Sequence, residues 1–599
     1  MGILEGIRRE YIFLTGVLRT LKRVNRVRAD TPASAADIVE RFAIEKPDNI
    51  AIYFENRRYT YREYDQAGNQ YARWALSQGI KRGDVVALLM ENRPEYLFAW
   101  LGIIKIGAVA ALINNNLTGR ALAHSLNTCG ADHLVLGVEL GDAYASAGPH
   151  LVRKLEPWTT GGVIEGTRDL DVELSCHSPA PLDPTLRAGL LAREKCFYIY
   201  TSGTTGMPKA AVVSHLRVFT LANAFSAIVN ATEKDRMYIA LPLYHSVGGI
   251  CAWGATITVG GSVILRRKFS ALNFWKDCRT YEATLFQYVG ELCRYLLNAA
   301  PDARDGEHMI RCAVGNGLRP EIWERFKSRF EIPKIIEYYG ATESNVSLVN
   351  YDGHTGAVGR IPGYLDSIFQ VKIVKFDVAR EEPVRGADGF CIEAAPDEAG
   401  EAIGHIRADQ NKALGRYEGY TEKEATEKKI LRDAFHKGDA WFRTGDLLRR
   451  DRHGYFYFVD RIGDTFRWKG ENVSTSEVAE VLSSFPGVLE ANVYGVAVPG
   501  TDGRAGMAAL VIKPDVDLNG LHTHLEHALP AYARPLFLRL TQTLEATGTF
   551  KHRKLDLARE GFDPATLPDA LLFDHPKMRG YVPLTPALYK EVVTGTLRL

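Results

Sequence analysis

The segment at residues 198–215, YIYTSGTTGMPKAAVVSH, has the composition of a phosphate-binding loop. A strand signal, FYIY, runs directly into a loop that contains Thr201, Ser202, Gly203, Thr204, Thr205, Gly206 and Lys209. Glycine lets backbone N–H groups turn toward an anion, and the hydroxyls and the lysine add donors and positive charge. The loop is not a Walker A loop, because G-x-x-x-x-G-K-[ST] is absent from the chain. A lone loop of this kind is usually a flexible turn, but a strand followed by TSGTTGMPK is far more specific, so we expect it to bind phosphates.

This loop and four later motifs resemble the adenylate-forming superfamily, which contains acyl-CoA synthetases, adenylation domains of peptide synthetases and beetle luciferases. The motifs follow the family's order and extend the resemblance over almost the whole chain. LPLYHSVGG, at 241–249, resembles the segment whose histidine, here His245, lies near the reacting carboxylate. GNGL, at 315–318, resembles the loop against the adenine, and the implied nucleotide-binding residues are Gly315, Asn316 and Gly317.

The segment YYGATES, at 338–344, resembles the centre of the family's site. In the family an aromatic residue of this segment stacks on the adenine, the threonine binds the α-phosphate and the glutamate binds Mg²⁺. The implied residues are Tyr338, Tyr339, Gly340, Thr342 and Glu343, with Thr204 of the first loop as a second metal ligand.

Two motifs near residue 450 complete the implied nucleotide site. WFRTGD ends in Asp446, which by resemblance accepts hydrogen bonds from both ribose hydroxyls, and VDRIGD contains Arg461, the implied ribose and phosphate partner. Taken alone, His245 is more often structural, Glu343 could be a solvated loop acid and Asp446 could cap a turn. Five motifs in the family's order are not explained by independent coincidences.

The chain departs from the family pattern near its catalytic lysine. Many members have a Gly-Lys step, whereas here Thr549 follows Gly548 and the first lysine is Lys551. This spacing, with RIGDTFRWKGENVS before it, resembles the branch of fatty-acid transport proteins and very-long-chain acyl-CoA synthetases. We therefore expect Lys551 to be the catalytic lysine, with Lys554 as the alternative.

The resemblance also implies a mobile small domain. We expect a basic amphipathic segment at 1–30, a large adenylate-forming domain at 31–462 and a small α+β domain at 463–599. Gly463 stands where many relatives have Asp or Lys, and its wide φ/ψ range suits a swivel, so the hinge candidates are Gly463 and Asp464. After rotation of the small domain, a pantetheine channel would be lined by Lys469, Gly470 and Glu471, although Gly470 could equally be a plain turn residue.

The implied reaction joins a carboxylate to the α-phosphate of ATP, releases pyrophosphate, and then passes the acyl group to CoA. Two anions must meet, so charge cancellation and alignment are the main requirements. Mg²⁺ on Glu343, with Lys551 near the carboxylate and the α-phosphate, would meet them. The expected cofactors are ATP, Mg²⁺ and CoA, and the expected substrate is a long-chain or very-long-chain fatty acid, whose activation can couple to fatty acid uptake.

Two other functions compete with this one. A fatty acyl-AMP ligase that loads a carrier protein shares the first half-reaction, but the segment at 468–474 resembles the CoA-using branch. A membrane protein that transports fatty acids directly needs a spanning helix. The apolar stretch at 247–265 has no charged residue, but it is broken by glycines and is expected to be a buried helix and strand. We expect the small residues at 247–259 to leave room for the acyl chain, whose burial contributes about 0.8 kcal/mol per CH₂.

The motifs lie on alternating strands and helices. Apolar strand signals occur at 84–90, 108–113, 133–137, 197–200, 237–240 and 262–265, with amphipathic helices such as 61–78 between them. This alternation is typical of parallel sheets covered by helices. We expect an α/β fold with a large N-terminal domain of this kind and a small mobile α+β C-terminal domain, after a change to short β signals near residue 440.

Net charge, cysteine content and the N-terminal pattern limit the possible partners and the location of the protein. The net charge is +1, which argues against nucleic acid, and eight cysteines without a CxxC pair argue against zinc or disulfides and suit a reducing cytoplasm. A helical stripe surrounded by basic residues is formed by Leu4, Ile7, Tyr11, Leu14, Leu18 and Leu21. Such a helix either lies on an anionic membrane surface or packs its stripe on the protein body. We expect a cytoplasmic enzyme, peripheral at the inner face of the cell membrane in the first case, and a homodimer remains open.

Overall fold

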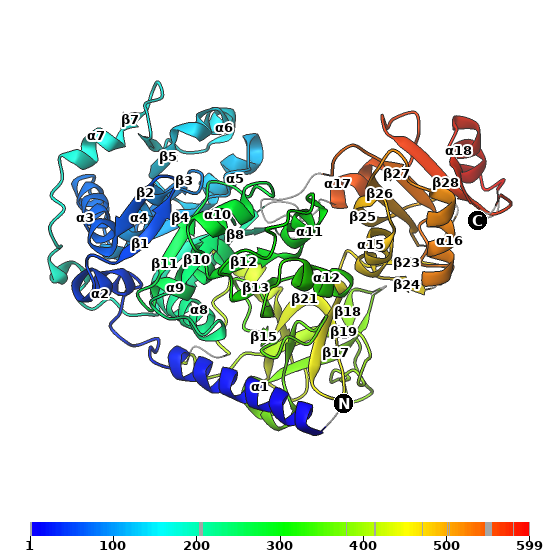
Figure 1. Ribbon diagram of the computed structural model, residues 1–599, viewed down its shortest axis with the longest axis horizontal. Coiled ribbons are helices and arrows are strands. Elements are labelled where there is room, and N and C mark those ends of the chain that lie inside the picture. The colour runs from blue at the N-terminus through cyan, green and yellow to red at the C-terminus, as the bar shows by residue number, and fades with distance from the viewer. Residues whose placement is uncertain are drawn as a thin grey trace.

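The computed structural model describes residues 3–597 except 203–207, 379, 413–414, 470, 500, 502, 545–553 and 579, and gives only the backbone of residues 3, 202, 472 and 555. These residues form a large unit with three main sheets and a smaller unit with sheets of its own (Figure 1). One hydrophobic core in the smaller unit consists entirely of residues from Phe466 onward.

Two parallel-rich sheets form the centre of the large unit, which confirms the α/β prediction. The first contains, in spatial order, β15 (Ser347–Val349), β14 (Ile335–Gly340), β13 (Cys312–Asn316), β12 (Leu285–Val289), β10 (Arg236–Ile239), β11 (Ser262–Leu265), β1 (Ile50–Phe54) and β2 (Arg57–Thr60). The second contains β7 (Arg168–Asp169), β6 (Glu156–Thr160), β5 (His133–Gly137), β3 (Val85–Leu89), β4 (Val109–Leu112), β8 (Lys195–Ser202) and β9 (Pro208–Ser214). Only the edge pairs β14–β15, β1–β2 and β8–β9 are antiparallel.

Helices fill the space between these sheets and cover both outer faces. The core between the sheets includes residues of α2 (Asp37–Glu45), α3 (Tyr61–Ser77), α4 (Pro94–Lys105), α8 (His215–Ile228) and α9 (Trp253–Ile257). The outer face of the first sheet packs on α10 (Phe274–Thr280), α11 (Gly290–Asn298) and α12 (Pro320–Arg329). The outer face of the second sheet packs on α5 (Gly119–Cys129) and α6 (Gly141–Ala147), with α7 (Leu170–Ser175) beside α3. Helices and sheets therefore alternate in five layers.

Local signals set the ends of these elements. Thr60 begins α3 with a capping box, in which its hydroxyl accepts from the backbone N–H of Glu63 and the Glu63 carboxylate accepts from the backbone N–H of Thr60. Gly79, in the left-handed region at φ 78°, follows the helix end and turns the chain toward β3. The uncharged run at 247–265 forms a π-helix at Val247–Ala252, then α9 and β11, all largely buried, as predicted.

A third sheet of the large unit is entirely antiparallel. Its strands are β16 (Gly359–Arg360), β22 (Tyr455–Arg461), β21 (Ala440–Arg450), β19 (Gly400–His405), β17 (Val371–Asp377) and β18 (Glu382–Pro383), with β20 (Ile430–Arg432) beside β21. Short helical turns lie around it at η5 (Gly363–Leu365), α13 (Asp366–Phe369) and α14 (Lys423–Glu427). Sequence reasoning did not resolve this sheet, because its strands pair across long sequence distances that local periodicity does not report.

The smaller unit is α+β, as predicted. Its five-stranded sheet contains β25 (Val488–Val496), β26 (Ala505–Ile512), β27 (Phe537–Leu540), β28 (Ala570–His575) and β29 (Gly580–Pro583), and a separate hairpin is formed by β23 (Phe466–Trp468) and β24 (Glu471–Val473). Its helices are α15 (Thr475–Ser484), α16 (Leu518–Ala528), α17 (Lys554–Glu560) and α18 (Pro586–Val593). Figure 1 shows this unit beside the large one, at the end where α11 and α12 lie.

The N-terminal helix α1 (Ile3–Val24) runs along the edge of the large unit and packs on α8 (Figure 1). It packs through Phe13 and Val17, which are buried, and through Gly16, where a Cβ would lie 2.4 Å from the ring of Tyr351. This face lies roughly 100° around the helix from most of the predicted stripe.

The interpretation in which α1 packs its stripe on the protein body is therefore wrong. Leu4, Ile7, Tyr11 and Leu18 are 84%, 62%, 69% and 65% exposed, and only Leu21, partly buried, joins the core. In the part of the chain that the structure describes, no helix has both the length and the apolar character needed to cross a bilayer.

Candidate functional site

The phosphate-loop motif forms the hairpin of β8 and β9, in which Thr201 pairs with Lys209 across the strands. The turn residues Gly203, Thr204, Thr205 and Gly206 lie outside the described residues, and of Ser202 only the backbone is described. The outer edge of β9 pairs with the segment at 419–421 through backbone hydrogen bonds of 3.0 and 3.1 Å. This pairing brings Tyr420 next to the phosphate hairpin.

Thr342 and Glu343 lie in the loop between β14 and β15, where two other segments meet them. The hydroxyls of Thr342 and Ser246 are 2.8 Å apart, so the loop contacts the histidine motif directly. The Tyr420 hydroxyl donates to Oε1 of Glu343 at 2.7 Å. Three motifs that are far apart in the sequence are thereby brought to one place.

Glu343 offers an acceptor that suits a hard cation. Its Oε2 is buried and has no hydrogen-bond partner among the residues that the structure describes. A buried carboxylate oxygen without a donor is costly unless a ligand satisfies it, and carboxylate oxygen is the ligand that Mg²⁺ prefers. Glu343 therefore fits the metal role that the motif implies.

His245 lies in the loop before the π-helix, and its Nδ1 accepts from the backbone N–H of Val247 at 3.3 Å. The π-helix and α9 do not provide open space through their glycines. A Cβ on Gly249 would lie 2.0 Å from the Leu243 carbonyl oxygen, and one on Gly254 would lie 2.3 Å from the Cβ of Ala222. The expectation that these small residues leave room for an acyl chain is wrong, because they allow close packing instead.

The GNGL loop follows β13 and is held by a carboxylate that sequence reasoning missed. Glu337, on β14, accepts hydrogen bonds from the backbone N–H groups of Gly317 and Leu318, both at 2.9 Å, and from the Tyr288 hydroxyl at 2.7 Å. Burial raises the pKa of Glu337 to about 8, although these three hydrogen bonds act to lower it. Asn316 keeps a buried Oδ1 without a partner among the described residues.

Replacing Glu337 with alanine should loosen this loop. Each of the two abandoned backbone N–H groups would cost about 1–3 kcal/mol, so we expect a lower melting temperature and a higher KM for ATP with little change in the KM for the acid. Steady-state kinetics and thermal melts measure both effects. An unchanged KM for ATP would contradict the positioning role.

Glu337→Gln removes the titratable group, and its amide nitrogen, which cannot accept, also gives up one of these hydrogen bonds at every pH. The pKa of Glu337 is raised from its ordinary 4.5 to about 8, so its favourable contribution to folding is complete below pH 4.5 and is lost as pH rises through 8. We expect the melting temperature of the native protein to fall relative to that of the Gln variant between pH 5 and 9. Parallel curves over that range would refute the shift.

The two neighbouring tyrosines point to opposite faces of β14, as successive strand residues do. The Tyr339 hydroxyl donates to Oδ2 of Asp446 at 2.5 Å, and Nε of Arg461 lies 3.7 Å from Oδ1 of the same carboxylate. Tyr338 instead packs against Phe225 of α8, with ring centroids 4.7 Å apart. The structure thus gathers Tyr339, Asp446 and Arg461, while Tyr338 lies in the core on the other side of the sheet and Gly340 is exposed at the strand end.

Of the two candidate lysines, the structure describes only Lys554. Lys551 lies outside the described residues, whereas Nζ of Lys554 donates to Oγ1 of Thr475 at 2.5 Å and lies 3.2 Å from the Asp464 carboxylate. Lys554 is therefore bound beside the predicted hinge. Gly463 has φ 92°, and a Cβ there would meet open space, so its conformation and not its packing favours glycine.

The predicted CoA segment forms the turn of the β23–β24 hairpin. Lys469 adopts φ 52°, and its Nζ lies 5.9 Å from the ring centroid of Trp468. Glu471 pairs with Trp468 across the hairpin, and Gly470 lies outside the described residues. A tight turn of this kind presents backbone groups rather than bulky side chains.

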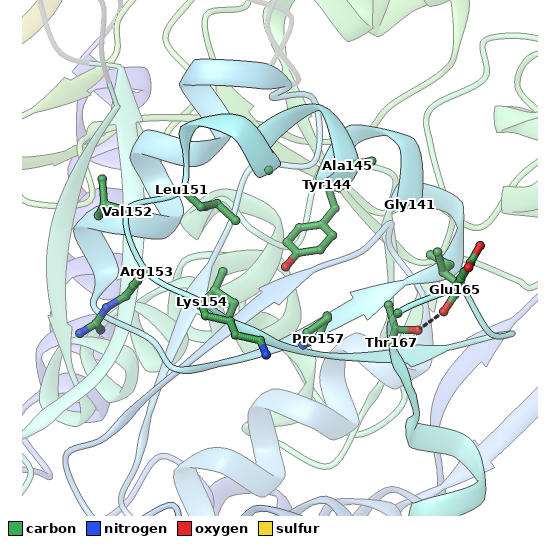
Figure 2. A pocket seen from close by; sticks show the side chains of 14 residues that line it. Gly141, Tyr144, Ala145, Leu151, Val152, Arg153, Lys154, Pro157, Glu165 and Thr167 are labelled. Atoms are coloured by element: carbon green, nitrogen blue, oxygen red, sulfur yellow. Dashed lines mark hydrogen bonds between the residues drawn. The ribbon is translucent and has the colours of Figure 1, made fainter.

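Several residues of the site carry no sequence signal of their own. Glu337, Ser246 and Tyr420 each act on a motif residue from another element, and only Glu337 has a readable cue, a carboxylate in an otherwise apolar strand (IIEYY). A surface hollow of about 590 Å³ lies elsewhere. Figure 2 shows Tyr144 and Leu151 facing Lys154 and Pro157 there, and none of the predicted site residues lines it.

Two family models match the chain. Residues 39–395 match the AMP-binding enzyme family, and residues 477–551 match the AMP-binding enzyme C-terminal domain. Among curated proteins, long-chain fatty acid transport protein 1 of Homo sapiens is 41% identical over 608 residues, which cover 100% of this chain and 93% of the relative. Long-chain fatty acid transport protein 6 of Mus musculus is 41% identical over 560 residues, which cover 93% of this chain and 90% of the relative.

Solved structures share the fold at lower identity. The anthranilate CoA ligase AuaEII, in complex with anthranoyl-AMP, matches with a TM-score of 0.73 and 22% identity over 87% of this chain and 95% of that chain. The Mycobacterium tuberculosis fatty acyl CoA synthetase matches with a TM-score of 0.62 and 22% identity over 88% of this chain and 98% of that chain. On these matches the chain belongs to the AMP-binding enzyme family and, within it, to the group of the long-chain fatty acid transport proteins.

Proposed function

We propose that this protein is a long-chain fatty acid–CoA ligase. It would join a fatty acid to the α-phosphate of ATP with release of pyrophosphate, and then pass the acyl group to CoA with release of AMP. The observation that carries the proposal is the convergence of Thr342, Glu343 and Ser246 beside the phosphate hairpin, with one carboxylate oxygen of Glu343 left for a cation. The full-length likeness to long-chain fatty acid transport proteins supports the substrate class.

The described residues can hold the nucleotide along one path. Asp446, set by Tyr339 and Arg461, would accept hydrogen bonds from the ribose hydroxyls, and Oδ1 of Asn316 is available to the amino group of adenine. Thr342 would donate to the α-phosphate. Glu343, with Thr204, would hold Mg²⁺, which would supply positive charge to the phosphates as pyrophosphate leaves. His245, in the loop that reaches Thr342 through Ser246, would lie near the acid.

Thioester formation needs a different arrangement. Lys551 would serve only the first half-reaction, and rotation at Gly463 or Asp464 would then bring Lys469, Gly470 and Glu471 to the channel for CoA. The open space around Gly463 and its positive φ support a pivot there, since residues with a side chain rarely adopt that conformation.

An end-point assay tests the proposal. The protein is incubated with ATP, Mg²⁺ and acids from acetate to very long chains, and AMP and thioester are quantified with and without CoA. Thioester formation that peaks with long chains is expected. Acyl-adenylate that accumulates without thioester would replace the proposal with a ligase that loads a carrier protein, and no turnover of any acid would overturn both.

We further propose that α1 contacts an anionic membrane surface. Leu4, Ile7, Tyr11 and Leu18 leave a row of apolar side chains in solvent, and Arg8, Lys22, Arg26 and Arg28 are exposed around it. An amphipathic helix of this kind lies in the headgroup region, where apolar burial and attraction to anionic lipid act together. Another face of the helix is already used to pack on α8.

Serine at Leu4, Ile7 and Leu18 should weaken vesicle binding. We expect at least about a tenfold loss of partitioning to anionic vesicles, because each lost apolar side chain removes burial of roughly 1.5–3 kcal/mol at most. Serine at Ile44 and Leu272, which are 82% and 90% exposed outside α1, is the matched control. Sedimentation measures both, and equal binding by all three proteins would refute the membrane contact.

A further inference from the structure

Arg217 holds the backbone of the loop that carries Thr342 and Glu343. It lies in the first turn of α8, where its backbone N–H donates to the capping hydroxyl of Ser214 at 3.1 Å. Its Nη2 donates to the carbonyl oxygens of Ala341, Thr342 and Ser344 at 3.1, 3.0 and 2.5 Å. One side chain thus meets three carbonyl oxygens within four residues of the loop.

The position is unfavourable for an arginine on general grounds. Burial lowers the pKa of Arg217, and the N-terminal end of a helix carries positive partial charge that disfavours a cation. Its Nε is also buried without a hydrogen-bond partner in the described part of the chain. The charges of Glu418 and Glu343 offset this cost in part.

The same loop is tied at its side chains by different elements. Thr342 contacts Ser246 before the π-helix, and Glu343 accepts from Tyr420 beside the phosphate hairpin. With its carbonyl oxygens turned toward Arg217, the loop directs the Thr342 and Glu343 side chains to these partners on the site side. One nitrogen makes all three contacts, and a lysine side chain is one bond shorter, so its ammonium would reproduce the contact only in part.

We infer that Arg217 is a positioning residue for adenylate formation, which fixes the loop so that Thr342 and Glu343 are aligned for the phosphates and the metal. The inference rests on the proposed ligase function. A displacement of about 1 Å at reacting groups can cost a hundredfold in rate, so loss of Arg217 should act on the first half-reaction far more than on the second.

The test compares R217A and R217K with the native protein in three measurements. We expect R217A to lower the rate of pyrophosphate release about a hundredfold and to raise the Mg²⁺ concentration for half-maximal rate severalfold, with R217K in between. Thioester formation from supplied acyl-adenylate should change by less than about threefold. Calorimetric titration of the protein–ATP complex with Mn²⁺ should show weaker metal binding, which does not depend on turnover.

R329A is the matched control. Arg329, at the end of α12, also holds a loop by its carbonyl oxygens, donating to Leu297 at 2.7 Å, Ala299 at 2.9 Å and Ala300 at 3.1 Å. In the described part of the chain, no hydrogen bond or ion pair joins it to a predicted site residue. We expect R329A to lower the melting temperature while leaving the Mg²⁺ dependence and the ratio of the two half-reactions unchanged.

The outcomes separate this inference from the proposed function. If the native protein makes no acyl-adenylate, the proposed function fails, and the Mn²⁺ titration alone decides the role of Arg217. If the native protein is active and R217A keeps the native Mg²⁺ dependence, metal binding and half-reaction ratio, the inference is overturned. If R217A does not fold, R217K carries the test, and native behaviour of R217K in all three measurements overturns it.

Discussion

Glu343→Gln is expected to lower the rate of acyl-adenylate formation at least about a hundredfold, with a higher requirement for Mg²⁺. The amide keeps the shape of the side chain and can still accept from the Tyr420 hydroxyl, so the fold should be retained. What is lost is the negative charge at Oε2, the buried oxygen without a partner among the described residues. A neutral oxygen binds a divalent cation much more weakly than a carboxylate does.

Pyrophosphate release in single turnovers, measured over a range of Mg²⁺ concentrations, gives the size of the effect. Tyr420→Phe is the control, because it removes only the 2.7 Å hydrogen bond to Oε1 and leaves the charge in place. We expect it to cost no more than about tenfold. If the two variants lose equally little activity, Glu343 does not hold the metal.

Lys551→Ala is expected to abolish the first half-reaction and spare the second. A lysine near the carboxylate and the α-phosphate neutralises charge that develops during adenylate formation, and removal of such a group costs about a hundredfold to a thousandfold. Thioester formation from supplied acyl-adenylate should stay within about threefold of the native rate, because we propose that Lys551 serves only the first half-reaction. The two rates are measured separately with pyrophosphate release and thioester as readouts.

Lys554→Ala is the informative comparison. Its ammonium is bound to Thr475 and to the carboxylate of Asp464, so it is occupied next to the hinge. Removal of this ammonium should slow the full cycle less than Lys551→Ala does. It should not slow the first half-reaction more than the second. If Lys554→Ala and not Lys551→Ala loses only adenylate formation, the assignment of the two lysines is reversed.

Lys551→Ala also tests whether ligation is coupled to fatty acid uptake. If fatty acid enters because it is trapped as acyl-CoA, cells that express Lys551→Ala should lose both ligation and uptake. Uptake that persists without ligation would overturn trapping and favour direct transport. The variant with serine at Leu4, Ile7 and Leu18 of α1 is a useful comparison in this experiment. It should reduce uptake while leaving the ligation rate in detergent unchanged.

The order and type of the main elements were predictable from the sequence. Buried apolar runs at 84–90, 108–113 and 133–137 became the adjacent strands β3, β4 and β5, because a parallel strand covered on both faces reads as a continuous apolar run. The helix at 61–78 was predictable from its apolar period and its capping residues. The third sheet was not, since its antiparallel pairs join residues near 370–405 with residues near 440–461.

The motifs named the candidate residues but not their neighbours. Strand alternation separates Tyr339 from Tyr338, yet which of the two faces Asp446 depends on how β14 packs against α8. Arg217 acts on Thr342, Tyr420 on Glu343 and Glu337 on Gly317, and these pairs lie 125, 77 and 20 positions apart in the sequence. Such contacts have no local periodicity, so only the folded chain reveals them.

The N-terminal helix and the glycines show the same limit. The periodicity of α1 predicted one apolar stripe, but the helix has two apolar faces. The face with Phe13 and Val17 packs on the protein body, because Gly16 lets Tyr351 approach closely. The small residues around Gly254 predicted open space for an acyl chain, whereas Ala222 occupies that space.

By itself the sequence determined the family, the alternating α/β pattern and the order of the motifs, because these depend on residue types and spacing along the chain. Only the tertiary structure decided which tyrosine meets Asp446, which face of α1 remains in solvent, and which arginine holds the Thr342–Glu343 loop. Those choices depend on the packing of elements that are distant in the sequence, where side-chain volume and hydrogen-bond geometry select one arrangement among several that the same pattern allows.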